Sequence, residues 1–506
     1  MIKAIDYFLN RITMYRLVLY ILVALILTGM LAGIFGYIPY SAVSIGISVI
    51  LVVGICCVSN RLFSAFYNAP VNVESVYITA LILVLILHPV QNTSDIKLLV
   101  WASILSMASK YIFAVNRKHI FNPAAIAVVL TSIGFGGSGS WWVGYTVMTP
   151  VVIIGSLLII RKIKREDLFF AFVLTAVVVG SLMTINRGGN ILTFFNHLLF
   201  RSSLFFFAGI MLTEPLTTPP SAKHRIIYGI ITGVLFLPQI HIKGFYTTPE
   251  LALVLGNIYS YLVSPKEKLW LALKEKVMSS RTVVDFVFHP VSKFSYLPGQ
   301  YMEWTLAHDH PDTRGNRRYF TLASSPTEDN IKLGVKFYEK SSSFKKSLFG
   351  LEANSHIIAS QLAGNFTLPN DPSKKLAFIA GGIGVTPFRS MIKYLIDKNE
   401  ARSIILLYFN KTEDEIVYKD VFEHAKELFD IRTVYVLSDL SSISDRWKGR
   451  KGIVTDEMIR KEVPDYKERL FYISGSHVMV SSCGQILKSM GLKNSQIKRD
   501  YFPGLT

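Results

Sequence analysis

Apolar segments follow one another through the first 263 residues, and this pattern restricts the possible folds more than any other feature of the chain. A helix needs about 20 apolar residues to cross the hydrocarbon core of a bilayer, where all backbone groups must be paired without water. The composition agrees, because 51% of the 506 residues are hydrophobic and the formal net charge is +18. We therefore expect a polytopic α-helical membrane domain of about ten spans. The expected spans are 17–38, 41–58, 74–88, 98–115, 120–135, 141–160, 168–184, 192–212, 226–240 and 250–263.

Basic residues are unequally distributed between the loops that join these spans. With the N-terminus in the cytoplasm, the inner segments hold most of the lysines and arginines, including four within residues 161–165. The outer loops hold only Lys97, Arg187 and Lys243. Basic residues favour cytoplasmic loops, and an even number of spans returns the chain to its starting side. We therefore expect a multi-pass protein of the cell membrane with both termini in the cytoplasm.

The cysteine count limits the cofactors. Cys56, Cys57 and Cys483 are too few for a four-cysteine zinc site, an iron–sulfur cluster or a disulfide framework. No expected span holds a pair of histidines that could carry a haem. Any redox cofactor is therefore organic or a metal held by other residues. We name no metal ligand and expect no nucleic-acid partner.

The composition changes near residue 263, beyond which strand and helix patterns alternate as they do in water-soluble proteins. Residues 264–280 mix basic side chains with apolar ones, namely Leu269, Trp270, Leu271 and Leu273. This pattern predicts an amphipathic linker that lies along the membrane, with its bases near anionic headgroups and its apolar side chains buried. An ordinary surface helix of a soluble domain explains the same pattern.

Two segments of the C-terminal half have the pattern of strands. "PGQYMEWTL" (298–306) is a turn followed by an alternating strand, and "RRYFTLASSP" (317–326) is a strand closed by Ser-Ser-Pro. Together they resemble the flavin-binding barrel of the ferredoxin–NADP reductase family, in which an Arg-x-Tyr-Ser/Thr motif contacts FAD. The resemblance implies an antiparallel β-barrel over residues 281–371. The FAD candidates are Tyr301, Arg318 for the pyrophosphate, Phe320 for stacking on the isoalloxazine in place of the usual tyrosine, and Thr321 for flavin N5.

A serine-rich turn follows in "KFYEKSSSFKKSL" (336–348). A turn that enters a helix presents backbone N–H groups and the positive helix end to an anion. The segment resembles the phosphate-binding segment of the same family, although serines replace the usual glycine. Helix capping alone also explains these serines. The candidate contacts to the FAD phosphates are Ser342, Ser343, Phe344 and Lys345.

A glycine-rich turn links an apolar strand to a helix in "KLAFIAGGIGVTPFRSMIKYL" (375–395). Glycines permit a tight turn and a close approach of the backbone to a pyrophosphate, which the helix end then faces. Its place after the flavin segments matches the order of the family, so we expect a Rossmann-like α/β NAD(P) domain over residues 372–506. The cofactor candidates in this turn are Gly381, Gly382, Gly384, Thr386 and Pro387.

Apolar strands 403–410, 433–438 and 470–476 complete the expected parallel sheet. In the family the last strand ends in Cys-Gly-Pro, followed by a methionine, and these residues face the nicotinamide. This chain has Ser474, Gly475 and Met479 there, so the usual thiol is absent, and we expect Cys483 to be a buried, inert thiol.

Two further residues bear on the cofactors. Asp439 follows the third strand of the expected sheet, where its carboxylate would repel a 2′-phosphate, so NADH is favoured and NADPH is the alternative. Phe502, in "RDYFPGL", resembles the aromatic ending that covers the flavin in the family, and a plain terminal strand is the alternative. Thr321, Ser474 and Phe502 are thus the residues expected at the reacting rings.

The membrane half resembles two membrane proteins that bind flavin: the B subunit of the sodium-translocating NADH:quinone oxidoreductase and the D subunit of the Rnf complex. The resemblance rests on "NRKHIFNPAAIAVVL" (116–130) and "MLTEPLTTPPS" (211–221). It implies a bound flavin, here noncovalent FMN or riboflavin, because the usual Ser-Gly-Ala-Thr attachment sequence is missing. The motifs "LILHP" (85–89) and "MLTEP" (211–215) end spans on opposite sides, as inverted repeats would require. The candidate membrane site comprises Asn122, Pro123, Glu214, Thr217 and Thr218, although Pro and Glu could merely mark helix ends.

The residues and the resemblances together predict a membrane-bound oxidoreductase. NADH would reduce FAD at the cytoplasmic face, and FAD would reduce a flavin or quinone in the membrane half, or an acceptor across the membrane. A cytoplasmic diaphorase with the helices as an anchor and a redox-coupled ion transporter are the other interpretations. The expected partners are NADH, a quinone or other electron acceptor, and the lipid bilayer.

Overall fold

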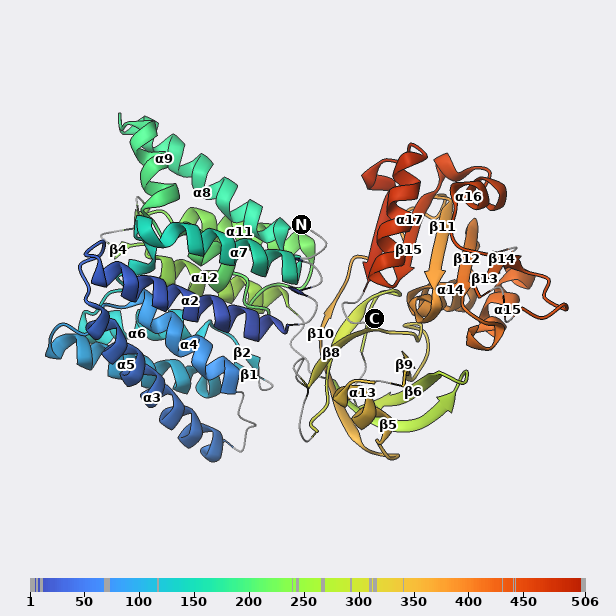
Figure 1. The fold of residues 1–506 in the computed structure, drawn as a ribbon, viewed down its shortest axis with the longest axis horizontal. Helices are drawn as coiled ribbons and strands as arrows, with labels where there is room; N and C mark the ends of the chain where they lie inside the picture. Colours follow the sequence, from blue (N-terminus) through green and yellow to red (C-terminus); the bar gives the residue numbers. More distant parts are fainter. Residues whose placement is uncertain are drawn as a thin grey trace. The chain divides into compact units, whose positions relative to one another are not determined.

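The computed structural model shows two compact units, Met1–Lys266 and Glu267–Thr506, which we name the helical unit and the C-terminal unit (Figure 1). The structure describes residues 5, 8–9, 12–67, 73–115, 118–238, 240–242, 245–264, 269–291, 294–308, 312, 316–339, 341–429, 431–439, 441 and 443–501.

The helical unit is built from helices joined mostly by short connections. The helices are α2 (Met14–Ile34), α3 (Ala42–Phe66), α4 (Val73–Ile86), α5 (Thr93–Ile112), α6 (Pro123–Phe135), α7 (Thr149–Ile163), α8 (Glu166–Asn186), α9 (Ile191–Phe200), α10 (Leu204–Phe206), the π-helix η3 (Phe207–Met211), α11 (Ala222–Leu235) and α12 (Pro249–Val263). The shorter elements are β1 (Ala114–Val115), β2 (Lys118–His119), η1 (Trp142–Gly144), η2 (Thr146–Met148), β3 (His241–Ile242) and β4 (Phe245–Tyr246).

A helix lies in each expected span, but not every helix is long and apolar enough to cross a membrane. Within the described ranges four helical segments are, and a fifth is added if α9 and Leu204–Met211, bent by 51°, are one span. The four are Met14–Ile34, Ala42–Phe66, Thr146–Ile163 and Glu166–Asn186. α4 has 14 residues, so it is about 21 Å long and shorter than the roughly 30 Å core. The count of ten spans therefore stays a prediction.

The first half of the C-terminal unit is an antiparallel six-stranded sheet with the order β8-β7-β10-β5-β6-β9. Alternate side chains of the strands, such as Met302 and Trp304, form one apolar core together with Phe344 of helix α13. The elements are β5 (Leu269–Met278), β6 (Val283–Pro290), β7 (Tyr301–Thr305), β8 (Arg317–Thr321), β9 (Ile331–Lys336), α13 (Ser343–Phe349) and β10 (His356–Ala363).

The expectation of an amphipathic linker over residues 264–280, and the alternative of a surface helix, are both wrong for the described part of this segment. Residues 269–278 form β5, which pairs with β6 and β10. Leu269, Leu271 and Leu273 point into the core while Trp270 is exposed. This period of two is the strand pattern, and of the two pairing partners β6 follows after a short turn whereas β10 lies far along the chain.

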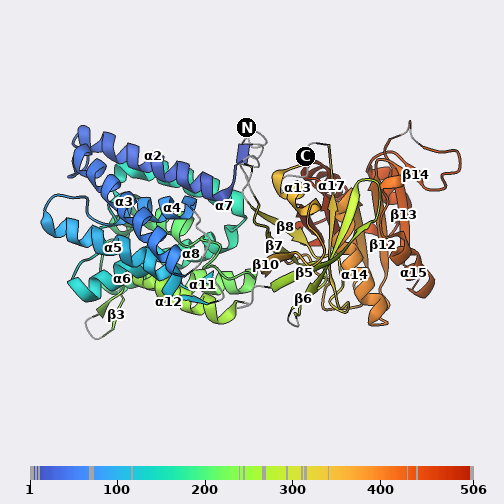
Figure 2. The same cartoon turned by 90° about the horizontal axis from the view of Figure 1, so that it is seen from below.

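The second half of the C-terminal unit is a parallel six-stranded sheet with the order β14-β13-β12-β11-β15-β16. Figure 2 shows β12, β13 and β14 of this sheet side by side. One face packs against α14 and α15 and the other against α16 and α17, as in doubly wound folds. Cys483 is buried on α17, and burial raises the pKa of its thiol to about 12. The elements are β11 (Leu376–Gly381), η4 (Gly382–Val385), α14 (Thr386–Asp397), β12 (Ile404–Asn410), η5 (Glu413–Glu415), α15 (Lys419–Phe429), β13 (Arg432–Leu437), β14 (Arg450–Lys451), α16 (Asp456–Glu462), η7 (Tyr466–Glu468), β15 (Leu470–Gly475), α17 (His477–Ser489), η8 (Asn494–Gln496) and β16 (Ile497–Tyr501).

Candidate functional site

Thr321 ends the strand that carries the flavin motif, and its hydroxyl is buried without a hydrogen-bond partner among the described residues. In the pairing of β7 with β8, Thr321 lies opposite Tyr301, so both side chains share one face of the sheet. Thr321 is 4% exposed, and its Oγ1 has no hydrogen-bond partner among the described residues. A buried hydroxyl without a partner costs about 1–3 kcal/mol. An acceptor or donor atom of FAD at this face would remove that cost, so Thr321 fits the role that the resemblance implied.

Arg318 and Phe320 lie on the opposite face of β8, where the alternation of the strand places them. The Arg318 guanidinium lies 5.3 Å from the ring centroid of Phe344, and the Phe320 and Phe344 rings are 5.9 Å apart. Asp312 accepts from Arg318 Nη2 at 2.9 Å. A cation held over an aromatic ring beside a loop can receive a pyrophosphate, which would replace this carboxylate as the partner of Arg318.

The serine-rich turn meets the same loop. Ser342 caps α13 by accepting from the Lys345 N–H at 3.3 Å. Ser343 Oγ accepts from the Asp312 N–H at 2.9 Å and lies 3.0 Å from His308 Nε2. Lys345 donates through Nζ to the Lys336 carbonyl at 2.6 Å. The structure thus brings Ser343 to Arg318 through the loop, whereas Phe344 is a core side chain and Lys345 binds the end of β9.

The glycine-rich turn packs on the end of β15. A β-carbon at residue 384 would lie 2.6 Å from the Ser474 carbonyl oxygen, and one at 381 would lie 2.1 Å from Met479 Sδ. The atoms near residue 384 belong to the backbone, so only glycine permits that approach, whereas the flexible Met479 side chain beside residue 381 can move aside. Gly382 has a φ of +52°, and a β-carbon there would meet nothing within 4 Å, so this side of the turn leaves room for a dinucleotide.

The remaining dinucleotide candidates gather at the same edge of the sheet. Thr386 and Pro387 begin α14 immediately after η4, so the positive end of the helix lies at the turn. Ser474 and Gly475 end the neighbouring strand β15. Asp439 follows β13, two strands away, where its Oδ1 accepts from Ser441. Phe502 lies outside the described residues.

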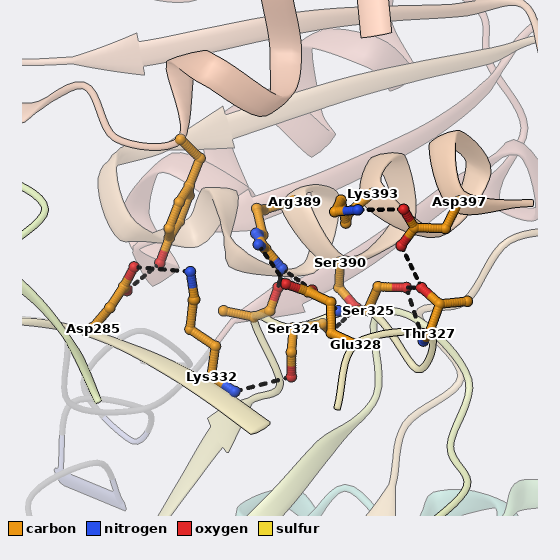
Figure 3. Close-up of polar contacts among 12 residues, drawn as sticks. Asp285, Ser324, Ser325, Thr327, Glu328, Lys332, Arg389, Ser390, Lys393 and Asp397 are labelled. Carbon is orange, nitrogen blue, oxygen red and sulfur yellow. Dashed lines mark hydrogen bonds and ion pairs between the residues drawn. The ribbon is translucent and has the colours of Figure 1, made fainter. Parts of the chain in front are cut away.

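A polar network that the sequence analysis did not single out joins α14 to the segment after β8. Arg389 pairs with Glu328 and Ser390 donates to the Ser324 carbonyl (Figure 3). Its signal in the sequence is an arginine between the apolar residues Phe388 and Met391, in a helix start that is buried throughout from Thr386 to Ile392. Burial opposes ionisation of Glu328, but the hydrogen bonds and charge of Arg389 outweigh it, so the pKa of Glu328 is lowered.

The candidate membrane residues form a second cluster, in the helical unit. His119 Nε2 lies 3.0 Å from Glu214 Oε1, and Asn122 Nδ2 donates to Glu214 Oε2 at 2.9 Å. The Thr217 hydroxyl donates to the same Oε2 at 3.2 Å, and the Thr218 hydroxyl donates to the Glu214 carbonyl at 2.6 Å. These side chains therefore gather around one partly buried glutamate.

Helix ends position this cluster. Asn122 caps α6 by accepting from two backbone N–H groups at 3.1 Å, and Pro123 occupies the first helical position, where its missing N–H costs nothing. The π-helix η3 ends at Met211, just before Glu214, and π-helical turns are frequent at functional sites. The Asn122 N–H donates to Asn257 Oδ1 at 2.8 Å, which extends the cluster to α12.

The sequence analysis missed a second buried acid in the helical unit. Glu250 is 3% exposed, lies in the first turn of α12 and accepts from Trp141 Nε1 at 2.8 Å. Its signal in the sequence is an acidic residue at the start of an apolar segment.

Comparisons with known proteins concern the C-terminal unit. Residues 378–485 match the family described as the oxidoreductase NAD-binding domain. The glycine betaine monooxygenase reductase subunit of Chromohalobacter salexigens is 26% identical over 211 residues, 41% of this chain and 56% of the relative. NADH-cytochrome b5 reductase 1 of Ajellomyces capsulatus is 27% identical over 253 residues, 48% of this chain and 80% of the relative. The cytochrome b5 reductase domain of Ulva prolifera nitrate reductase has a TM-score of 0.42 and 21% identity, covering 47% of this chain and 98% of that chain.

The chain spans little more than half the length of the first of these relatives. The matched family and the relatives, together with the antiparallel sheet and the parallel sheet that follows it in the chain, agree on the nature of the C-terminal unit. It is an FAD- and NAD(P)H-binding oxidoreductase module of the ferredoxin–NADP reductase type.

Proposed function

We propose that the whole chain is a membrane-bound NAD(P)H-dependent flavin oxidoreductase that passes electrons from its C-terminal unit to an acceptor held by its helical unit. FAD supplies the central chemistry, because it takes up a hydride and can release electrons singly. The chain's own residues hold and orient the two cofactors. Thr321 meets the flavin edge, Arg318 pairs with the pyrophosphate, and the turn from Gly381 to Gly384 receives the dinucleotide.

NADH is the proposed donor, with NADPH as the alternative. Asp439 lies after β13 at the edge of the sheet that carries the glycine-rich turn. A carboxylate near the adenosine ribose favours two free hydroxyls and repels a 2′-phosphate. The name of one relative includes NADH, which supports the same choice.

The exposed apolar surface of the helical unit supports the proposed place in the cell membrane. Leu31, Ile50 and Ile133 are 56%, 76% and 80% exposed, on α2, α3 and α6. Water-soluble monomers rarely expose so many large apolar side chains, whereas lipid tails cover them at no cost. With the basic loops inside, both termini and the C-terminal unit are cytoplasmic in this proposal.

The Glu214 cluster is the observation that carries the membrane part of the proposal. Reduction of a quinone or a flavin takes up protons with the electrons, and a carboxylate beside an imidazole can deliver them. Glu214 and His119 form such a pair, with Asn122 and Thr217 holding the carboxylate. The proposed acceptor is therefore a quinone or a noncovalent FMN or riboflavin at this cluster.

The first experiment counts acid-released FAD and FMN per chain in the detergent-purified protein and then follows anaerobic reduction by NADH. One FAD per chain would favour direct delivery to a diffusible quinone, and a second flavin would favour an internal relay. No reduction by NADH or NADPH would refute the proposal.

Glu214→Gln separates the proposal from its alternatives. We expect reduction of ferricyanide by NADH to stay within about twofold of the wild-type rate, and reduction of a water-insoluble quinone to fall at least about tenfold. Unchanged quinone reduction would favour a diaphorase with an anchor. Sodium-dependent turnover in sealed vesicles would favour an ion transporter.

A further inference from the structure

Two consecutive residues of α14 hold the backbone that follows the flavin strand (Figure 3). Arg389 Nη1 donates to the Ala323 carbonyl at 3.0 Å, and Ser390 Oγ donates to the Ser324 carbonyl at 2.6 Å. These carbonyls come two and three residues after Thr321, whose buried hydroxyl lacks a partner among the described residues. Side chains of α14 therefore bind backbone carbonyls of the flavin segment, directly after Thr321, the residue that fits the flavin edge.

Glu328, from the same segment, fixes the Arg389 side chain. Both guanidinium Nη atoms donate to its carboxylate, with Nη2 to Oε1 at 2.9 Å. The Ser325 N–H donates to the same carboxylate at 2.6 Å. Arg389 is 4% exposed, so its guanidinium, paired with the carboxylate at two points, is removed from solvent. A two-point pair between planar groups restricts both position and orientation.

The same helix carries the dinucleotide site. α14 begins at Thr386, directly after the glycine-rich turn, and Arg389 is its fourth residue. The two ends of the first helical turn therefore serve two sites: the first residues lie at the turn that receives the dinucleotide, and Arg389 binds the flavin segment. A helical turn has a fixed rise of about 5.4 Å, so the connection between them is stiff.

A second contact supports the same junction. The Tyr418 hydroxyl donates at 2.5 Å to Oδ1 of Asp285, a residue of β6 that is 2% exposed. Gly334 of β9 lies beside both, since a β-carbon there would be 2.4 Å from the Tyr418 hydroxyl and 3.0 Å from the Thr386 methyl carbon. The antiparallel sheet and the parallel sheet are thus packed together at the start of α14.

We propose that Arg389 is a positioning residue: through Glu328 and the two carbonyls it sets the spacing between the flavin strand and the dinucleotide turn, and with it the spacing of the two rings. The inference rests on the proposed function, in which a hydride passes from NAD(P)H, which is oxidised, to FAD, which is reduced. The rate of such a transfer depends steeply on alignment, and a misplacement of about 1 Å can slow it about 100-fold.

The test uses the full-length protein in detergent and the variant Arg389→Lys, which keeps the charge but loses the fork. We expect the FAD content and the Kd for NAD⁺ to stay within about twofold, while the rate of FAD reduction by NADH falls about tenfold. Amide hydrogen exchange of residues 322–328 should become faster. The exchange measurement does not depend on turnover.

Glu328→Gln should act in the same direction, and Glu468→Gln is its matched control. Glu468 accepts from Lys375 at 2.6 Å in an exposed ion pair. If Arg389→Lys and Glu328→Gln leave both the reduction rate and the exchange at the level of Glu468→Gln, the inference is overturned.

Ser390→Ala tests the positioning role of α14 if the Arg389 and Glu328 variants do not fold. It removes only the hydrogen bond to the Ser324 carbonyl, and we expect reduction to slow about threefold with faster exchange in the same segment. An unchanged rate and exchange would overturn the inference. If NADH and NADPH fail to reduce the wild-type protein, the proposed function falls and the inference falls with it.

Discussion

Gly384 and Ser474 pack so closely that a β-carbon at residue 384 would lie 2.6 Å from the Ser474 carbonyl oxygen and 2.7 Å from the Gly475 backbone. The dinucleotide turn and the last residues of β15 are therefore one rigid surface. Neither neighbour can move aside cheaply, because both contacts are with backbone atoms of a central strand.

Gly384→Ala should consequently separate the turn from β15 and weaken dinucleotide binding. We expect the Kd for NAD⁺, measured by calorimetry, to rise at least about tenfold, since an overpacked contact of this kind costs about 1–3 kcal/mol. Gly350→Ala, outside the dinucleotide turn, is the control, because a β-carbon there would come no closer than 3.6 Å to its neighbours. Equal effects of the two variants would contradict the prediction.

Thr321→Val tests whether the unpartnered Thr321 hydroxyl forms a contact with bound FAD. In the apoprotein the variant should be as stable as the wild type or more so, because a buried polar group without a partner is removed. With FAD bound, the variant should lose about 1 kcal/mol of stability relative to the wild type, because the contact to FAD is lost. The measurement is the rise in unfolding midpoint from the apoprotein to the FAD-bound protein, which should be smaller in the variant. A clearly destabilised apoprotein would mean that the hydroxyl is already satisfied.

The Arg389–Glu328 pair predicts an acid-dependent loss of stability. Burial raises the pKa of Glu328 but Arg389 outweighs it, so the pKa lies below its ordinary value of 4.5. A carboxyl with a lowered pKa in the folded state contributes stability above its unfolded pKa and loses it as the pH falls through the folded pKa. The thermal midpoint of flavin release should therefore fall more steeply below pH 4.5 in the wild type than in Glu328→Gln. Parallel curves would show that the pair contributes no such stability.

Asp439→Arg should improve the use of NADPH relative to NADH. An arginine beside the ribose would attract the 2′-phosphate that a carboxylate repels, and we expect the ratio of kcat/KM values to shift toward NADPH by at least about tenfold. Asp414→Arg, at an exposed carboxylate that accepts a long contact from Arg281, serves as the control. An unchanged ratio would place the adenosine ribose elsewhere.

Sequence patterns were sufficient wherever the constraint is local. Residue spacing and turn chemistry predict the glycine-rich turn, the paired flavin segments and the parallel sheet. This works because a short segment with a particular backbone conformation requires particular residues, such as glycine, at fixed positions. The same holds for the apolar helices, whose ranges follow from hydropathy. The number of helices that cross a membrane does not follow from hydropathy, because it also depends on the length, charge and bending of each helix.

Tertiary structure decided the rest. Residues 269–278 form a strand because they pair with β6, which follows after a short turn, and with β10, which lies far along the chain. Hydropathy alone could not distinguish this strand from an amphipathic helix. Arg389 and Glu328, separated by 61 residues, meet only when the antiparallel sheet and the parallel sheet pack together. The sequence by itself thus determined which cofactors this chain is built to hold, and only the fold decided how the two sites are spaced, because that distance depends on contacts between residues remote in the chain.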